Sequence, residues 1–424
     1  RETLGLPIAD YLRGPTAAEV TVDSAGKGSF RVAGNFKLDA STMALDVIDW
    51  RKPAGVPGQA SYSAKWEGRG PLQVERASLQ AGDLKAQGSA VFDDGALTQA
   101  DIRDLEYAGN VFGMVTARRR PDGGYSLRVD GKTADLRGPL RHAFAADGGG
   151  GLAFDAVARV DRAVVADQLE LHGLNVEVEA AGGKLNSLRA AGAYAEGGRL
   201  EVNVYPGVPR RRATIRTDNA AGALRYLGIV SLGGGNLKLD GEFADDQPGA
   251  PLRGLTVIEN FKVVRAPLLA QLLALGSLTG ISDVLRGEGI AFSRADVPFT
   301  LTRELLTLDK ARAIGPAIGI TADGTLKRTT DELSLSGTLA PAYTINSVLG
   351  QIPLIGTLLV GREGEGLVGF SYGVSGTAAE PKVTVSPLSA LLPGILRRLF
   401  PAPTGQPGDG GIERQPRQGA GGDK

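Results

Sequence analysis

Apolar and polar residues alternate in short runs along most of the chain. A period of two is typical of strands that have one buried face and one exposed face. Between these runs, Asp94-Gly95, Asp122-Gly123-Gly124 and Gly197-Gly198 supply the positive φ angles that tight hairpins need. Helical segments do not alternate regularly with the runs, so the pattern predicts a meandering antiparallel sheet and argues against a parallel βαβ fold. The clearest runs are AEVTVD (18–23), FRVAGNFKLD (30–39), YSLRVDG (125–131), LNVEVEA (174–180), RLEVNVYP (199–206), NLKLDGEF (236–243), LSLSGTL (333–339) and PKVTVSP (381–387).

Glycine recurs on the apolar side of these runs. An apolar residue is followed by glycine four positions later and by another apolar residue two positions beyond, so each set of three shares one face of a strand. Two interpretations are open: the glycines mark bulges and bends, or they leave the concave apolar face of a curled sheet open for a guest. The spacing between the sets is irregular, which argues against a strict solenoid repeat. The sets are Phe30, Gly34 and Phe36; Leu84, Gly88 and Ala90; Leu188, Gly192 and Tyr194; Leu237, Gly241 and Phe243; Ile320, Gly324 and Leu326; and Leu333, Gly337 and Leu339.

Helical patterns interrupt the strands at 219–230, 266–290, 346–359 and 386–400. In the last segment, apolar residues fall at steps of three and four, Ser386 is a suitable N-cap and Pro387 suits the first turn. The apolar segments at 266–290, 346–359 and 386–400 are each interrupted by Gly, Pro, Ser or Thr. A bilayer span needs about 20 predominantly apolar residues. We therefore expect short amphipathic helices that cover an apolar trough, dock on a bilayer surface, or plug the end of the sheet and protect its edge.

Composition removes several classes of function. The 424 residues include 47 basic and 47 acidic side chains, so no net field favours nucleic acid or an acidic substrate. Cysteine is absent, which excludes disulfides, a thiolate nucleophile and Cys-ligated zinc. The chain begins RETLGLPIADY, without Met or an apolar signal segment. We expect it to be a piece of a longer protein.

Candidate catalytic groups are few. The two histidines, His142 and His172, stand in unrelated contexts, which argues against a His-based zinc site or a His-dependent triad. The acidic pairs Asp93-Asp94 and Asp245-Asp246 lie in turns, where Asp is common for local backbone reasons. We therefore predict a protein that is not an enzyme and that uses no metal or cofactor.

Two further motifs are candidates for anion binding. GEGLVG (364–369) matches the dinucleotide pattern G-x-G-x-x-G, but a strand-like run follows it, and Glu363 and Glu365 would repel phosphate. The arginine triplets at 118–120 and 210–212 stand beside turns. They are either solvated hairpin ends or contacts for phosphate or sulfate groups.

Four short sequence motifs in the second half of the chain resemble those of a known protein family. They are GEGI (287–290), AYTINSVLGQIPLIG (342–356), GEGL (364–367) and SPLSALLPG (386–394). Residues 217–400 resemble the C-terminal part of AsmA-like proteins, in the subgroup that shares the YhdP central domain. Ser386 stands where that family usually has Asn, and WRKPAGVPG (50–58) and RRRPDGGYSLRVDG (118–131) extend the similarity more loosely.

The resemblance implies a periplasmic protein anchored in the inner membrane, with a long groove-shaped β-sheet that conducts phospholipid between the two membranes of a Gram-negative envelope. Family members usually begin with a transmembrane helix, which this sequence lacks, so the anchor is inferred. The implied organisation is a β-rich groove segment at 1–216, an AsmA-like C-terminal β region with amphipathic helices at 217–400, and a disordered Pro/Gly-rich tail at 401–424.

The residues and the resemblance together predict a mainly β fold whose long curved antiparallel sheet forms an apolar groove. An apolar trough holds acyl chains without catalytic groups, since each buried CH₂ contributes about 0.8 kcal/mol. The predicted partners are phospholipid and a membrane surface, the outer membrane at the C-terminal end, and no nucleic acid. The alternatives are an envelope scaffold that carries no lipid, and an enzyme acting on envelope glycans or lipids, which would need an acid pair facing a pocket.

The groove residues predicted are Phe36, Leu84, Gly88, Gly192, Leu237, Leu239, Gly241 and Leu335. The residues predicted for a membrane-interfacial helix are Leu388, Leu391, Leu392, Ile395, Leu396, Arg397, Arg398, Leu399 and Phe400.

Overall fold

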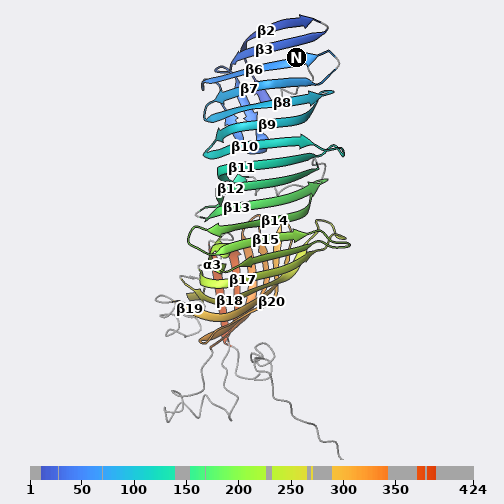
Figure 1. Cartoon of the computed structure of the whole chain (residues 1–424). Helices are drawn as coiled ribbons and strands as arrows, with labels where there is room; N and C mark the ends of the chain where they lie inside the picture. The colour runs from blue at the N-terminus through green and yellow to red at the C-terminus, as the bar shows by residue number, and fades with distance from the viewer. Residues whose placement is uncertain are drawn as a thin grey trace, which may run out of the picture.

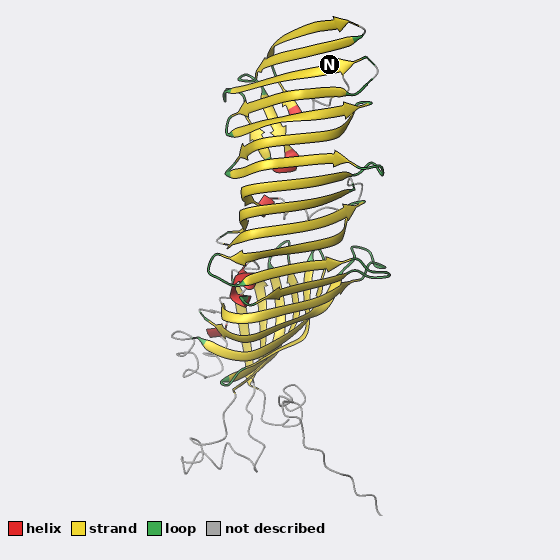
Figure 2. Cartoon of the chain, in the orientation of Figure 1, coloured by secondary structure: helices red, strands yellow, loops and turns green. Residues whose placement is uncertain are grey.

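The computed structural model describes residues 11–26, 28–68, 70–138, 153–167, 169–225, 232–264, 269–270, 289–341, 370–377 and 380–387. Nearly all of the elements in these ranges are strands (Figure 2). The elements are β1 (Leu12–Arg13), β2 (Ala17–Gly26), β3 (Ser29–Lys37), β4 (Thr42–Leu45), the 3₁₀ helix η1 (Asp46–Ile48), β5 (Trp50–Lys52), β6 (Gly58–Glu67), β7 (Leu72–Ala81), β8 (Leu84–Asp93), β9 (Ala96–Tyr107), β10 (Asn110–Arg119), β11 (Tyr125–Asp135), β12 (Phe154–Ala166), β13 (Leu169–Ala181), β14 (Lys184–Tyr194), β15 (Arg199–Tyr205), β16 (Arg212–Thr217), α3 (Ala220–Arg225), β17 (Leu232–Phe243), β18 (Leu252–Val263), β19 (Ile290–Leu301), β20 (Leu305–Ile314), β21 (Ile318–Lys327), β22 (Glu332–Pro341), β23 (Phe370–Thr377) and β24 (Pro381–Pro387).

One sheet of 21 strands runs through the described part of the chain (Figure 1). Its strands follow sequence order from β2 to β24, with β4 and β5 set aside in a small separate sheet with β1. No described residues pair β2 with β24, so the sheet is open. All eight alternating runs are confirmed as strands. Each predicted turn joins two consecutive strands of the sheet as a hairpin, with positive φ at Asp94, Gly95, Gly123, Gly197 and Gly198.

The predicted antiparallel sheet is wrong at one junction, where β11 and β12 pair in parallel. Residues 136–153 connect these strands, and parallel neighbours need a crossover of about a dozen residues or more. That connection is long enough to return the chain to the side from which β11 started. The sheet is therefore mixed.

Cross-strand register gives the sheet one apolar face and one polar face along its whole length. In the middle strands, for example, Val129 is opposite Ala158, which is opposite Val176, which is opposite Ala190. We call the side that these residues and their register partners occupy the apolar face. Glu177 and Arg189 are opposite one another on the other side, the polar face. The alternation of the sequence, shifted by one residue at β-bulges such as the one at 172–175, thus places most of the apolar positions of the sheet on one surface.

The two margins of the sheet differ. Connections 38–57, 218–231, 264–289 and 342–369 begin and end at one of them, which we call the long-connection margin. The opposite margin carries only hairpin turns, such as 94–95, 120–124 and 244–251, apart from the point where 136–153 re-enters the sheet. We call it the short-turn margin. Large insertions therefore gather on one side of the sheet.

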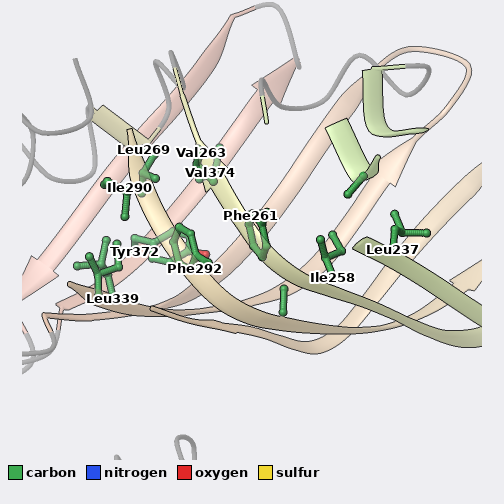
Figure 3. Close-up of a cluster of buried hydrophobic side chains, with 13 residues drawn as sticks. Leu237, Ile258, Phe261, Val263, Leu269, Ile290, Phe292, Leu339, Tyr372 and Val374 are labelled. Carbon is green, nitrogen blue, oxygen red and sulfur yellow. The ribbon is translucent and has the colours of Figure 1, made fainter. Parts of the chain in front are cut away.

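Beyond β16 the sheet curls, and its apolar face closes on itself. Leu237, Ile258, Phe292, Leu339 and Tyr372 come from five different strands and belong to one buried cluster (Figure 3). Within it, the rings of Phe261 and Phe292 stack with centroids 5.2 Å apart. The curled end is thus filled with the protein's own side chains.

The helix predicted at 219–230 is confirmed in part, as α3 (Ala220–Arg225). Asn219 caps it, since its Oδ1 accepts a hydrogen bond of 2.9 Å from the Gly222 amide. Ser386 and Pro387, predicted to begin a helix, instead end strand β24, where they pair with β23. Residues 346–359 and 388–400 lie outside the described residues, as does 266–290 except for 269–270, in a helical turn, and 289–290. The tail at 401–424 also lies outside them.

The sheet is continuous across the boundary expected after residue 216, which falls inside β16. Among the helices of the described ranges, none is long and apolar enough to span a membrane.

Candidate functional site

The apolar face is the candidate site, because it is the largest feature of the described structure that local packing leaves unexplained. From β7 to β15, most of its side chains are half-buried, as Val74, Ile102, Val129 and Val178 illustrate. Neighbouring strands shield them from the sides, but most belong to no buried cluster. Twenty steps between 21 strands, at about 4.8 Å each, give this face a length of about 95 Å.

All eight residues predicted for the groove lie on the apolar face. Register connects Phe36 through Ala60 and Leu79 to the strand that carries Leu84 and Gly88. Farther along, Gly192 is opposite Leu200, which is opposite Thr217 and then Leu237. Leu239, Gly241 and Leu335 continue the same side of the sheet. Leu84 and Leu237 are almost fully buried, with 1% and 4% of their surface exposed, whereas Phe36 and Gly192 are half-buried.

The glycines of the apolar face serve different purposes. At Gly34, an added Cβ would meet the ring of Tyr62 at 2.6 Å, so glycine makes room for an aromatic neighbour. At Gly88, the obstacle is backbone, the Asp101 carbonyl oxygen at 2.4 Å, as expected where β9 bends around a bulge. At Gly192, the nearest atoms are 3.5 Å away, which is ordinary contact. Gly192 is therefore a glycine of this face that packing does not require.

A small sheet covers the apolar face near the N-terminal end. Trp50 of β5 packs on Ala81 and Leu84 at the long-connection margin. Its Nε1 donates a 2.8 Å hydrogen bond to Asp83, which also accepts the Ala108 amide at 2.9 Å. These two hydrogen bonds hold the pKa of Asp83 below its usual range.

The buried side chain of Lys52 in β5 stabilises this small sheet through hydrogen bonds to backbone carbonyl oxygens. Only 2% of its surface is exposed, and its ammonium donates to the carbonyl oxygens of Leu38 at 2.7 Å, Ser41 at 2.8 Å and Pro53 at 3.3 Å. A buried ammonium is tolerated only with such partners. No local pattern around Lys52 distinguishes this buried charge from an exposed lysine.

Helix α3 covers the same face at the start of the curl. Gly222 packs against the ring of Tyr194, and Ala220 has no exposed surface. Arg225 at the end of α3 pairs with Glu196, and Asn219 donates to the Gly197 carbonyl oxygen at 3.0 Å. Like the small sheet, α3 therefore covers the apolar face at the long-connection margin.

The arginine triplet at 118–120 divides into different roles at the short-turn margin. Arg118 pairs with Asp101 at 2.6 Å and holds the pKa of that carboxyl below its usual range. Arg120 pairs with Asp122 at 2.8 Å and with Asp155 at 2.5 Å. Arg119 is exposed and forms no ion pair with any described residue.

The triplet at 210–212 contains a buried ion pair. Arg211 is 7% exposed, donates to both carboxylate oxygens of Asp245, and lies 4.2 Å from the ring centroid of Phe243. Lys184 approaches the same carboxylate at 2.9 Å. The hydrogen bonds from Arg211 and Lys184 depress the pKa of Asp245 strongly. Its location in a turn was predicted, but its buried partners were not, because they are distant in sequence.

The other candidate groups do not form a catalytic constellation in the described ranges. His172 is an exposed residue of β13, and Asp93 and Asp94 are exposed at a hairpin. Within those ranges, no group of His, Asp or Glu side chains is arranged to hold a metal ion. His142 and GEGLVG (364–369) lie outside the described residues.

No protein-family model, curated protein or solved structure matches this chain.

Proposed function

We propose that the protein is a non-enzymatic lipid carrier whose apolar face forms a groove that holds the acyl chains of phospholipids. The observation that carries this proposal is the apolar face of the sheet from β7 to β15, where most side chains are half-buried and where, among the described residues, the small sheet and α3 cover it at the long-connection margin. The resemblance to AsmA-like proteins supports the same function. It adds the expectation of a periplasmic location, anchorage in the inner membrane and movement of phospholipid toward the outer membrane.

Hydrophobic burial is sufficient to drive the binding. Each CH₂ that leaves water contributes about 0.8 kcal/mol, so ten methylenes supply about 8 kcal/mol before the cost of ordering the lipid is subtracted. Head groups need no buried partner if they project past the short-turn margin, where the fully described connections that border the face are hairpin turns. The polar face, with its cross-strand pairs such as Glu177 and Arg189, keeps the outside of the sheet hydrated.

We further propose that 388–400 docks on a membrane surface at the end of the carrier. Strand β24 ends at the long-connection margin, beside the strand ends from which 342–369 departs. Two of the apolar segments identified in the sequence therefore leave the sheet close together. In this proposal, burial of apolar side chains dominates, and Arg397 and Arg398 each add about 1 kcal/mol near anionic lipid.

Mass spectrometry of lipid extracted from the purified chain tests the carrier function. After expression in a Gram-negative host, we expect phospholipid in stoichiometric amount. A chain that is folded but carries no more lipid than an unrelated protein purified in parallel would instead favour the envelope scaffold.

Vesicle flotation tests the docking proposal separately. The intact chain is expected to float with vesicles that contain phosphatidylglycerol. Replacing Leu392 and Leu396 together with Asp should abolish flotation, whereas replacing both arginines with Ala should only weaken it. Failure of the unmodified chain to float would refute docking and leave lipid carriage standing.

A further inference from the structure

Arg119 is a charge on the apolar face. Register places it opposite Tyr125, in line with Ala117 and Val115 of the same strand. In the regularly paired segments around it (residues 100–102, 115–119, 125–129, 154–158 and 176–180), Arg119 is the only charged residue on this face. A single charge in so long an apolar surface requires a reason.

Packing does not supply that reason. The neighbours Arg118 and Arg120 are neutralised by aspartates, but Arg119 forms no ion pair or hydrogen bond with any described residue. Its side chain is exposed, at the last position of β10, where the apolar face meets the short-turn margin. Register places it next to Ala117 and Leu127 on the apolar face, at the end of the strand pair that borders the turn 120–124.

We propose that Arg119 binds the phosphate of a phospholipid whose acyl chains lie on the apolar face. The inference rests on the proposed carrier function and adds the head-group chemistry and its position. A guanidinium matches phosphate oxygens with two parallel hydrogen bonds. A cation at the border between apolar surface and water is where the phosphate of a lipid would lie once its chains are buried. Free phosphate would lack the acyl contacts, so the lipid is the favoured source of the phosphate.

The test compares two lipids with identical acyl chains on the full 424-residue chain. Phosphatidylglycerol carries the phosphate and diacylglycerol lacks it, and native mass spectrometry counts the retained lipid. Arg119→Gln should reduce retention of phosphatidylglycerol about fivefold and leave diacylglycerol unchanged. Arg128→Gln is the matched control, because Arg128 is an exposed arginine of the adjacent strand, on the polar face. It should change neither lipid.

Three results would overturn the assignment. One is an unchanged ratio of the two lipids in Arg119→Gln, and another is an equal loss in Arg128→Gln. The third is displacement of phosphatidylglycerol by excess inorganic phosphate, which would mean that a phosphate contact alone retains the ligand. If the unmodified chain retains neither lipid, the carrier function itself fails. Retention of both lipids with no selective effect at Arg119 refutes only this inference.

Discussion

Replacing Gly192 with Leu tests whether a guest occupies the apolar face. An added Cβ would lie 3.5 Å from the His172 carbonyl oxygen, 3.5 Å from Leu171 Cβ and 3.6 Å from Leu174 Cα. These are ordinary contacts, so we expect the variant to fold with a stability within about 1 kcal/mol of the parent. The four new carbons would occupy space above the face that the proposal assigns to acyl chains.

The magnitude follows from the methylenes displaced. Loss of four buried CH₂ groups at about 0.8 kcal/mol each costs about 3 kcal/mol, or roughly a hundredfold in lipid retention. Lipid per folded chain is measured by extraction and mass spectrometry, with circular dichroism to confirm folding. Ala191→Leu is the control, since Ala191 is the exposed neighbour on the polar face. Parental lipid content in a folded Gly192→Leu protein would show that no acyl chain occupies the space above Gly192. Gly241→Leu is a poorer test, because its Cβ would approach Leu252 Cδ1 at 2.9 Å and disturb the fold itself.

Two further predictions concern the charges that hold the sheet together. Lys52→Met should lower the free energy of unfolding by about 3 kcal/mol, because three carbonyl oxygens lose their buried donor; urea denaturation measures the change. Asp245→Asn should cost roughly 3 kcal/mol, since it leaves Arg211 buried without a carboxylate. The folded-state pKa of Asp245 lies below its unfolded value, so its stabilisation is complete above about pH 4 and is lost as the pH falls toward the depressed pKa. The stability difference between parent and Asp245→Asn should therefore narrow as the pH falls below about 4.

Exposed charges nearby serve as controls for both. Lys37→Met in β3 and Asp246→Asn beside Asp245 should each change the free energy of unfolding by less than about 0.5 kcal/mol. Equal losses in the buried and exposed variants would contradict the assigned roles. A stability difference for Asp245→Asn that does not vary below pH 4 would contradict the pH argument.

The strands and hairpins were predictable because their signals are local. Alternation defines a strand and its two sides, and Asp94-Gly95 or Gly197-Gly198 provides the positive φ angles of the turns. Parity along each strand was enough to place residues such as Phe36 and Leu335 on the apolar face. The same parity identifies Arg119, which the sequence presented only as a member of an arginine triplet.

The remaining features depend on contacts between distant residues. The parallel pairing of β11 with β12 depends on the path of 136–153, which strand periodicity does not encode. Lys52 and Arg211 have the same local sequence signals as exposed basic residues, and only the tertiary packing buries them. For the same reason, coverage of the apolar face by the small sheet was not foreseen.

The most direct test of the account uses the alternation of β13. A photoreactive amino acid is placed singly at Val176, Glu177 and Val178, and crosslinked lipid is detected after irradiation in cells. Val176 and Val178 are half-buried on the apolar face, and Glu177 between them is exposed on the polar face. Phospholipid adducts are expected at 176 and 178 and none at 177. Equal adducts at all three positions, or none at any of them in a folded protein, would contradict the claim that this face carries lipid.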